Sequence, residues 1–140
     1  DWTLPKVNRV IFHLEAAHDP EFVIGKIHEN KKEAGVAVNP ETSWEKLLPY
    51  CASADLVQTL AVPPGAAGQK FVPETLAKIQ HLRQNHPECI IEVDGGINLE
   101  TGKKCVDAGA NILVSANYIF SAKDVKKAIE ELKNAASARG

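Results

Sequence analysis

Short runs of β-branched and apolar residues alternate with stretches that carry helix signals, and this alternation most constrains the fold. A strand followed by a helix, repeated along the chain, is the pattern of βα units on a parallel sheet. Such strands are covered on both faces, which fits runs that are apolar almost throughout. The predicted strands are 7–14, 34–38, 56–62, 89–93 and 112–116.

The stretches between these runs carry helix start and stop signals. Asp19 with Pro20 is typical of a helix N-cap followed by proline at the first helical position. Asn98 is placed to cap a helix over 99–108 that Gly109 ends. Further helices are predicted over 41–50, from Pro73 onward with Leu76, Ile79 and Leu82 on one face, and after a capping box formed by Ser121 and Asp124.

Composition excludes several classes of protein. The 140 residues suit a single domain, residues 1–140, with 44% apolar and 24% charged residues and a net charge of −2. We therefore expect no nucleic-acid partner and, without an apolar run near membrane-spanning length or a signal peptide, no membrane partner. Three widely spaced cysteines argue against a disulfide framework, favour packing roles and suit a cytoplasmic location.

Five βα units fit either an open doubly wound sheet or part of an eight-unit barrel. In both folds chemistry lies where the parallel strands end. Residues with chemical potential do follow each run: His13 and Glu15, Asn39 and Pro40, loop 63–69, residues 94–96 and residues 115–117.

Asp94 and His13 are the candidate reactive groups. Asp94 ends an apolar run, where a carboxylate could act as a general acid/base or bind a divalent metal. It could equally cap the turn through Gly95 and Gly96. His13 could be a metal ligand, although a lone histidine at a strand end is more often structural.

The loop PPGAAGQ, residues 63–69, could bring backbone N–H groups close to an anion, but most loops of this composition are simple turns. Gly95, Gly96 and the loop after the last strand could complete a phosphate site. Neither GxxxxGK[ST] nor GxGxxG occurs, which disfavours P-loop and Rossmann nucleotide sites, and there is no Ser or Cys nucleophile motif.

Five motifs in order resemble the ribulose-phosphate 3-epimerase family. They are FHLEA (12–16), AGVAVNPET (34–42), DLVQTLAVPPGAAGQKFVPETLAKI (55–79), IEVDGGIN (91–98) and AGANILVSANYIF (108–120). The resemblance implies a TIM (β/α)8 barrel, of which this chain supplies about five βα units, strands four to eight.

The resemblance also implies chemistry. The family interconverts D-ribulose 5-phosphate and D-xylulose 5-phosphate with two carboxylates and a divalent metal, which we expect to be zinc, with iron, manganese or cobalt as alternatives. Transferred by motif, His13 and Asp94 bind the metal and Asp94 is also one of the acid/base carboxylates. Leu60 belongs to the substrate pocket, and the residues expected around the sugar phosphate are Gly65, Ala66, Ala67, Gly68, Gly95, Gly96, Ala116 and Asn117.

The chain departs from the family pattern in ways that leave alternatives open. PGFGGQ has become PGAAGQ, and the strands with the family's other metal-binding His and partner Asp have no counterpart here. The start at Asp1 and the absence of Met indicate a fragment, a processed chain or an engineered chain, with roughly 70–90 further N-terminal residues expected in the parent gene. Alternatives are an allulose 6-phosphate type epimerase and a non-catalytic half-barrel that binds phosphate or a partner. Open sheet edges also predict a homo-oligomer.

Overall fold

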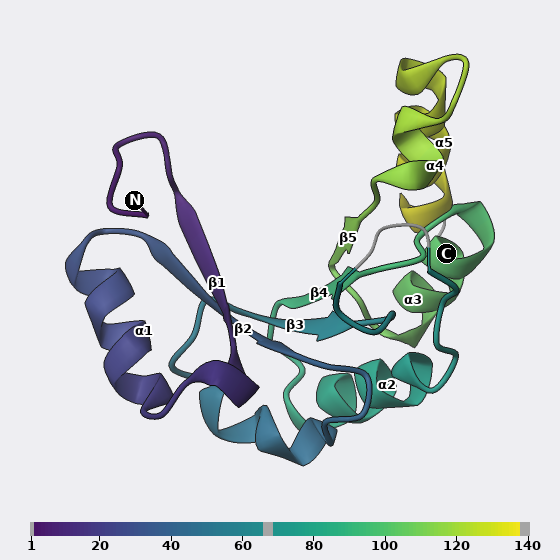
Figure 1. Ribbon diagram of the computed structural model, residues 1–140. Coiled ribbons are helices and arrows are strands. Elements are labelled where there is room, and N and C mark those ends of the chain that lie inside the picture. Colours follow the sequence, from purple (N-terminus) through teal and green to yellow (C-terminus); the bar gives the residue numbers. More distant parts are fainter. Residues whose placement is uncertain (1, 66–68, 138–140) are drawn as a thin grey trace.

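A five-stranded parallel sheet organises the chain. The computed structural model describes residues 2–65 and 69–137. The strands lie in sequence order, so each pairs with the next along the chain (Figure 1). Their bounds are β1 Arg9–His13, β2 Glu33–Val38, β3 Leu56–Leu60, β4 Ile91–Asp94 and β5 Ile112–Val114. The five predicted strands are confirmed, with shorter bounds for most of them.

The helices lie in an arc along the outer side of the curved sheet (Figure 1). No element of the described residues covers its concave side. The α-helices are α1 Pro20–Glu29, α2 Thr75–Asn85, α3 Leu99–Ala108, α4 Asn117–Phe120 and α5 Val125–Ser137, and the 3-10 helices are η1 Leu14–Ala16, η2 Trp44–Lys46 and η3 Leu48–Tyr50.

Two helix starts follow the predicted signals. Asp19 accepts a hydrogen bond from the Phe22 N–H, with Pro20 at the first helical position. Asn98 and Thr101 form a reciprocal capping box at the start of α3. Local polar side chains thus fix where these helices begin, as their N-cap positions require.

Three details of the predicted helices were wrong. Residues 41–50 form two short 3-10 helices, with Pro49 in the second. Asp124, not Ser121, accepts the N–H of Lys127 at the start of α5. The short helix α4, which closely follows β5, was not predicted, because its stretch carries no helix signals and its apolar residues resemble a continuation of the strand.

The core lies between the sheet and the helical arc. Because side chains alternate along a strand, one set from each strand packs against the helices. This set includes Val36, Val57, Ile91 and Val93, all fully buried. Ile27, Ile79 and Leu82 come from the helices. The opposite set faces the concave side and includes Arg9, Glu33, Gln58, Glu92 and Asp94, whereas the buried Thr59 lies in the core-facing set.

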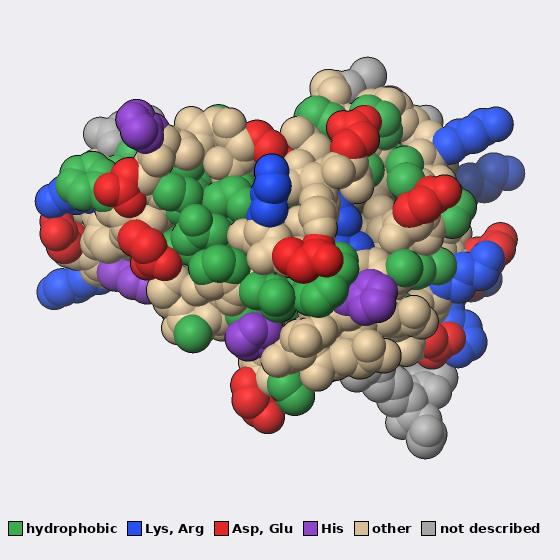
Figure 2. Space-filling view, turned by 90° about the horizontal axis from the view of Figure 1, so that it is seen from below, with side chains coloured by type: hydrophobic (Ala, Val, Ile, Leu, Met, Phe, Trp, Pro, Cys, Tyr) green, Lys and Arg blue, Asp and Glu red, His purple; other side chains and the backbone are tan. Residues whose placement is uncertain are grey.

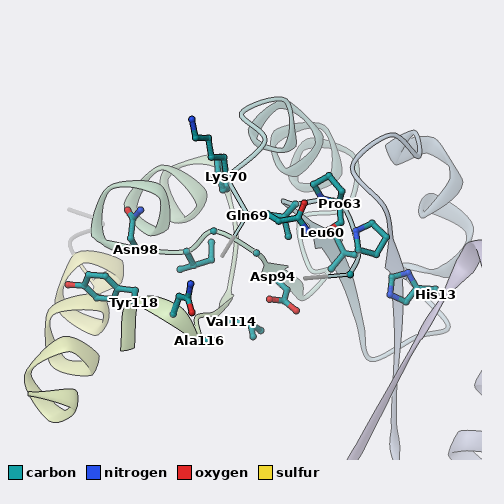
Figure 3. Close-up of a pocket in the computed structure, with 18 residues that line it drawn as sticks. His13, Leu60, Pro63, Gln69, Lys70, Asp94, Asn98, Val114, Ala116 and Tyr118 are labelled. Atoms are coloured by element: carbon teal, nitrogen blue, oxygen red, sulfur yellow. Dashed lines mark hydrogen bonds between the residues drawn. The ribbon is translucent and has the colours of Figure 1, made fainter. Parts of the chain in front are cut away.

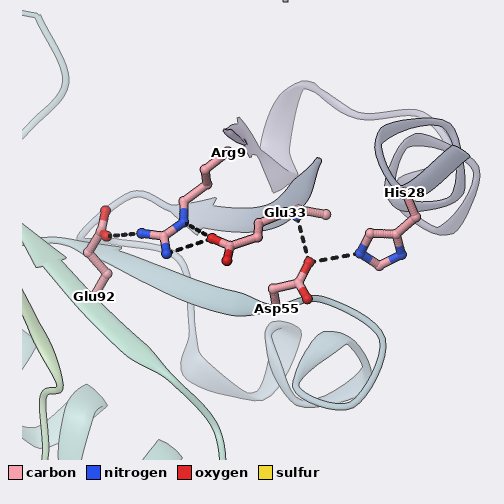
Figure 4. A network of polar contacts seen from close by, with 6 residues as sticks. Arg9, His28, Glu33, Asp55 and Glu92 are labelled. Carbon is pink, nitrogen blue, oxygen red and sulfur yellow. Dashed lines mark hydrogen bonds and ion pairs between the residues drawn. The ribbon is translucent and has the colours of Figure 1, made fainter. Parts of the chain in front are cut away.

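Polar side chains join the strands at their amino ends on the concave side (Figure 4). Arg9 of β1 bonds Glu33 of β2 at 2.8 Å and approaches Glu92 of β4 at 3.5 Å. Glu92 is 4% exposed and also accepts from the Gln58 amide at 2.6 Å. The buried carboxylate is therefore paired, as its desolvation requires.

The outer surface carries mixed charge. Figure 2 shows the face seen from below in Figure 1, where acidic and basic side chains occur among apolar ones. None of the helices in the described part of the chain has the length and apolar character needed to cross a membrane.

Candidate active site

A cavity of about 850 Å³ opens where the strands end, lined by the last residues of several of them (Figure 3). His13 ends β1, Leu60 ends β3, Asp94 ends β4 and Val114 ends β5. The loops after β3, β4 and β5 and the start of α4 supply the rest of its wall. Parallel strands place their carboxyl ends together, so residues far apart in sequence meet here.

Asp94 is the only carboxylate among the described residues that line this cavity. Its carbonyl accepts the Ala61 N–H at 2.7 Å, which joins the ends of β3 and β4. Burial raises the pKa of the Asp94 side chain, and a hydrogen bond from the Gly95 N–H offsets only part of this effect. No cation of the described chain forms an ion pair with it. A carboxyl group with a raised pKa is better able to hold a proton during a reaction.

The two glycines after Asp94 let neighbouring loops approach. Both have positive φ, 113° at Gly95 and 64° at Gly96. A Cβ on Gly95 would lie 2.5 Å from Val62 Cγ2, and one on Gly96 would lie 2.9 Å from the Phe71 backbone nitrogen. The loop after β3 therefore packs directly on this turn, and a side chain at either position would push the cavity wall apart.

The turn is also fixed from the helix that follows it. The Thr101 hydroxyl donates to the Gly96 carbonyl at 2.8 Å and accepts the Asn98 N–H at 2.9 Å. Ser115 donates to the Ile97 carbonyl at 2.8 Å, which ties the loop after β5 to the same segment. Side chains of α3 and of the loop after β5 thereby hold the cavity wall in place.

His13 lies at the rim of the cavity next to a second polar group. Its Nδ1 is 3.7 Å from an oxygen of Glu15, which belongs to η1. Glu15 accepts the Asn39 N–H at 2.8 Å and the Thr42 hydroxyl. Although desolvation acts to raise it, these hydrogen bonds lower the pKa of Glu15. An ionised Glu15 therefore connects β1 to the loop after β2.

Lys78 of α2 also binds the loop after β2. Its ammonium group donates to the carbonyls of Asn39 at 2.9 Å, Pro40 at 3.0 Å and Thr42 at 2.5 Å. Lys78 is only 7% exposed. Its desolvation lowers its pKa, while Glu15 and Glu41 act in the opposite direction. The buried cation is thus matched by carbonyl and carboxylate oxygens.

Most of the predicted phosphate residues line the cavity. Leu60 and the set Gly65, Gly95, Gly96, Ala116 and Asn117 are all in its wall. Ala66, Ala67 and Gly68, also predicted for this role, lie outside the described residues. The cavity thus brings Asp94 and His13 together with the described members of the predicted phosphate set.

Several lining residues were not predicted from the sequence. Lys70 and Tyr118 line the cavity, and Asn98 does so in addition to capping α3, while Gln69 belongs to the predicted loop 63–69. Gln69 donates to the Pro63 carbonyl at 2.7 Å and closes the loop after β3. Lys70 and Tyr118 adjoin predicted loops, so proximity to those loops is the signal that could have found them.

The metal prediction requires more donors than this cavity supplies. His13 and Asp94 are both in its wall. However, no group of three or more His, Cys, Asp or Glu side chains among the described residues could hold a metal ion. A catalytic zinc site has three protein ligands, so the two residues do not make one by themselves. We therefore derive no step through a metal.

Comparison with known proteins agrees with the motifs. Residues 2–120 match the family described as "Ribulose-phosphate 3 epimerase family". The chain belongs to the ribulose-phosphate 3-epimerase family. The resemblance seen in the motifs is thereby confirmed.

Curated relatives of this family come from different kingdoms. The chain is 39% identical over 123 residues to the ribulose-phosphate 3-epimerase of Schizosaccharomyces pombe, covering 88% of this chain and 54% of that protein. It is 41% identical over 119 residues to that of Chlamydia trachomatis, covering 81% and 51%. The chain therefore spans about half the length of the curated relatives it matches.

Solved structures with the same fold are more distant in sequence. KGPDC from Streptococcus mutans in complex with D-R5P has a TM-score of 0.72 at 13% identity, covering 94% of this chain and 62% of that one. Thiamine phosphate pyrophosphorylase from Pyrococcus furiosus has a TM-score of 0.68 at 23% identity, covering 93% and 59%. These are TIM-barrel proteins, so the five units form part of a (β/α) barrel, as predicted.

Proposed function

We propose that this chain contributes the carboxyl-terminal catalytic wall of a sugar-phosphate 3-epimerase that interconverts D-ribulose 5-phosphate and D-xylulose 5-phosphate. The observation that carries the proposal is the position of Asp94. It ends β4 in the cavity wall, its pKa is raised by burial, and two glycines follow it. Membership of the epimerase family supports the reaction type.

Asp94 would exchange the proton at C3 of the sugar on one face. Its ionised carboxylate removes the proton, and the resulting acid can return one to the same face. Inversion at C3 requires a second acid/base group on the opposite face. Since Asp94 is the only carboxylate in the described cavity wall, that second group belongs outside this set.

The phosphate of the substrate would lie against the backbone of the glycine-containing loops. Gly65, Gly95 and Gly96 lack side chains that could keep an anion away from N–H groups. Lys70 adds a cation to the same cavity wall. An allulose 6-phosphate substrate would need more room at this end, and turnover of the two sugars compared side by side decides between them.

The divalent metal stays a prediction, with His13 and Asp94 as the expected donors and zinc, iron, manganese or cobalt as candidates. It would stabilise negative charge on the enediolate. Elemental analysis of a longer protein that also carries the family's other metal-binding His and partner Asp tests it, with about one ion per chain expected. We also propose a cytoplasmic location, which the free cysteines suit. We further propose a homo-oligomer, because β1 and β5 are open sheet edges. Sedimentation tests the assembly.

The central experiment replaces Asp94 by asparagine. In a longer protein that also carries the expected N-terminal strands, Asp94→Asn should reduce conversion of D-ribulose 5-phosphate at least a hundredfold, because general acid–base groups contribute about that much or more. The fold should persist, since burial already disfavours the charged form of Asp94. Asp107→Asn is the matched control, because Asp107 lies on the surface of α3 and pairs with Lys103 at 3.0 Å.

Binding gives a readout that does not depend on turnover. Titration with D-ribulose 5-phosphate should shift the NMR signals of Gly95, Gly96 and Ala116 in the original chain and in both variants. If Asp94→Asn retained full turnover, Asp94 would have no place in the mechanism. If the substrate shifted none of these signals, this cavity would not be the sugar-phosphate site.

A further inference from the structure

The structure also brings together two cysteines at the other end of the strands. Cys51 follows η3 and shortly precedes β3, and Cys89 shortly precedes β4. The starts of these strands are adjacent, because Val57 N–H bonds the Ile90 carbonyl at 2.9 Å. The two segments that lead into β3 and β4 therefore run side by side.

The two thiols lie close enough to interact, and a side-chain hydrogen bond between them shifts the pKa of each. Cys89 is buried in the core, and Cys51 is half-buried and packs against that core. Backbone carbonyls hold both: Cys51 Sγ lies 3.5 Å from the Leu47 carbonyl oxygen, and Cys89 Sγ lies 3.8 Å from that of Ile90.

We propose that Cys51 and Cys89 form a dithiol modification site that two-electron oxidants convert to an intramolecular disulfide. The site lies at the amino ends of the strands, whereas the candidate active site lies at their carboxyl ends. It does not rest on the proposed function.

The surroundings favour Cys89 as the attacking group. The hydrogen bond from Cys51 lowers the pKa of Cys89, against the effect of desolvation, and Arg83 lowers it further. The same bond raises the pKa of Cys51. Arg83 is fixed near the pair by its Nε and Nη2 bonds to the Gly109 carbonyl, at 3.1 and 2.9 Å. A thiolate beside a cation and a second thiol is the arrangement of reactive dithiols.

The reaction balances with hydrogen peroxide as the oxidant. The Cys89 thiolate attacks one peroxide oxygen, the O–O bond breaks, and the departing oxygen leaves as water after taking up a proton. This gives a sulfenic acid at Cys89. The Cys51 sulfur then attacks the Cys89 sulfur, its thiol proton combines with the departing hydroxyl, and a second water leaves. Two thiols are oxidised to one disulfide while one peroxide is reduced to two waters.

The third cysteine supplies an internal control. Cys105 is fully buried in α3, and burial raises its pKa to about 12. It lies in the core without a thiol partner among the described residues. Cys105 should therefore react at least ten times more slowly than the Cys51–Cys89 pair, because the thiolate is the reactive form.

The test uses the whole reduced chain and a small excess of hydrogen peroxide. The free-thiol count should fall from three to one, with a mass loss of two hydrogens and a peptide that links Cys51 to Cys89. Thermal unfolding of the oxidised protein should shift upward by roughly 5–10 °C, since the bridge closes a long loop. The comparison of two redox states of one chain avoids any folding defect of a variant.

Variants separate this pairing from other oxidation. Cys105→Ser should still lose two thiols at the original rate. Cys51→Ser and Cys89→Ser should form no intramolecular disulfide. The proposal is overturned if the count stays at three, if Cys105 reacts as fast as the pair, or if only disulfide-linked dimers form.

Discussion

Replacing Lys78 by methionine should destabilise the chain measurably, because this buried cation joins α2 to the loop after β2. Its ammonium group donates to three carbonyls, those of Asn39, Pro40 and Thr42, at 2.9, 3.0 and 2.5 Å. Methionine keeps much of the apolar stem but leaves these carbonyls without their donor.

The magnitude follows from two opposing effects. Hydrogen bonds to charged groups are worth about 1.5–3 kcal/mol each, so three bonds set an upper limit of roughly 4.5–9 kcal/mol. Desolvation of Lys78, which lowers its pKa, cancels part of this gain. Water can also reach the carbonyl groups, since Asn39, Pro40 and Thr42 are only half-buried. We expect a net loss of about 2 kcal/mol in the free energy of unfolding.

Urea unfolding of the Lys78→Met chain measures this loss as a lower midpoint at unchanged slope. Lys103→Met is the matched control, because the Lys103 side chain is 53% exposed and pairs only with Asp107 across one helical turn. Exposed pairs of this kind contribute at most about 0.5 kcal/mol. If both variants lost the same free energy, the three carbonyl bonds of Lys78 would not stabilise the fold.

Two further predictions concern glycine and pH. Gly96→Ala should cost about 2–4 kcal/mol of unfolding free energy, because Gly96 has φ 64° and the added methyl meets Phe71. Its control is Gly25→Ala in α1, where a Cβ meets nothing within 4 Å; this variant should gain up to about 1 kcal/mol. Equal losses of the two variants in urea titrations would contradict this prediction. Although desolvation acts to raise the pKa of Asp55, hydrogen bonds from the Ala34 N–H and from His28 lower it. Its contribution to stability is therefore fully present above the unfolded pKa and is lost as pH falls through the folded value. Asp55→Asn should destabilise the chain at pH 6 and progressively less as the pH falls below the ordinary range of aspartate; a difference that did not shrink on acidification would refute this.

The alternation of strands and helices was predictable because each element carries its own local signal. Apolar runs predict strands, and Asp19 and Asn98 mark helix starts through side chains that bond nearby N–H groups. Strand ends were harder to predict. The run 56–62 continues past β3, but Ala61 already bonds outside the regular ladder, and its carbonyl accepts the Val72 N–H.

Contacts between distant segments could not be predicted from local patterns. Asp94 was identified as a candidate because it ends an apolar run, whereas Tyr118 carries no such signal and lines the cavity only through the path of α4. The meeting of Cys51 and Cys89 likewise depends on the pairing of β3 with β4. Their spacing in the sequence points only to packing.

The order of strands in the sheet has a consequence for how the chain folds. Every strand pairs only with strands adjacent in sequence, so no pairing waits for a segment from the other end of the chain. The entropy of loop closure is then spent in several small steps, each of one βα unit. Such a sheet can grow from any pair of neighbouring strands, and synthesis of the chain from its amino end can add the units in order.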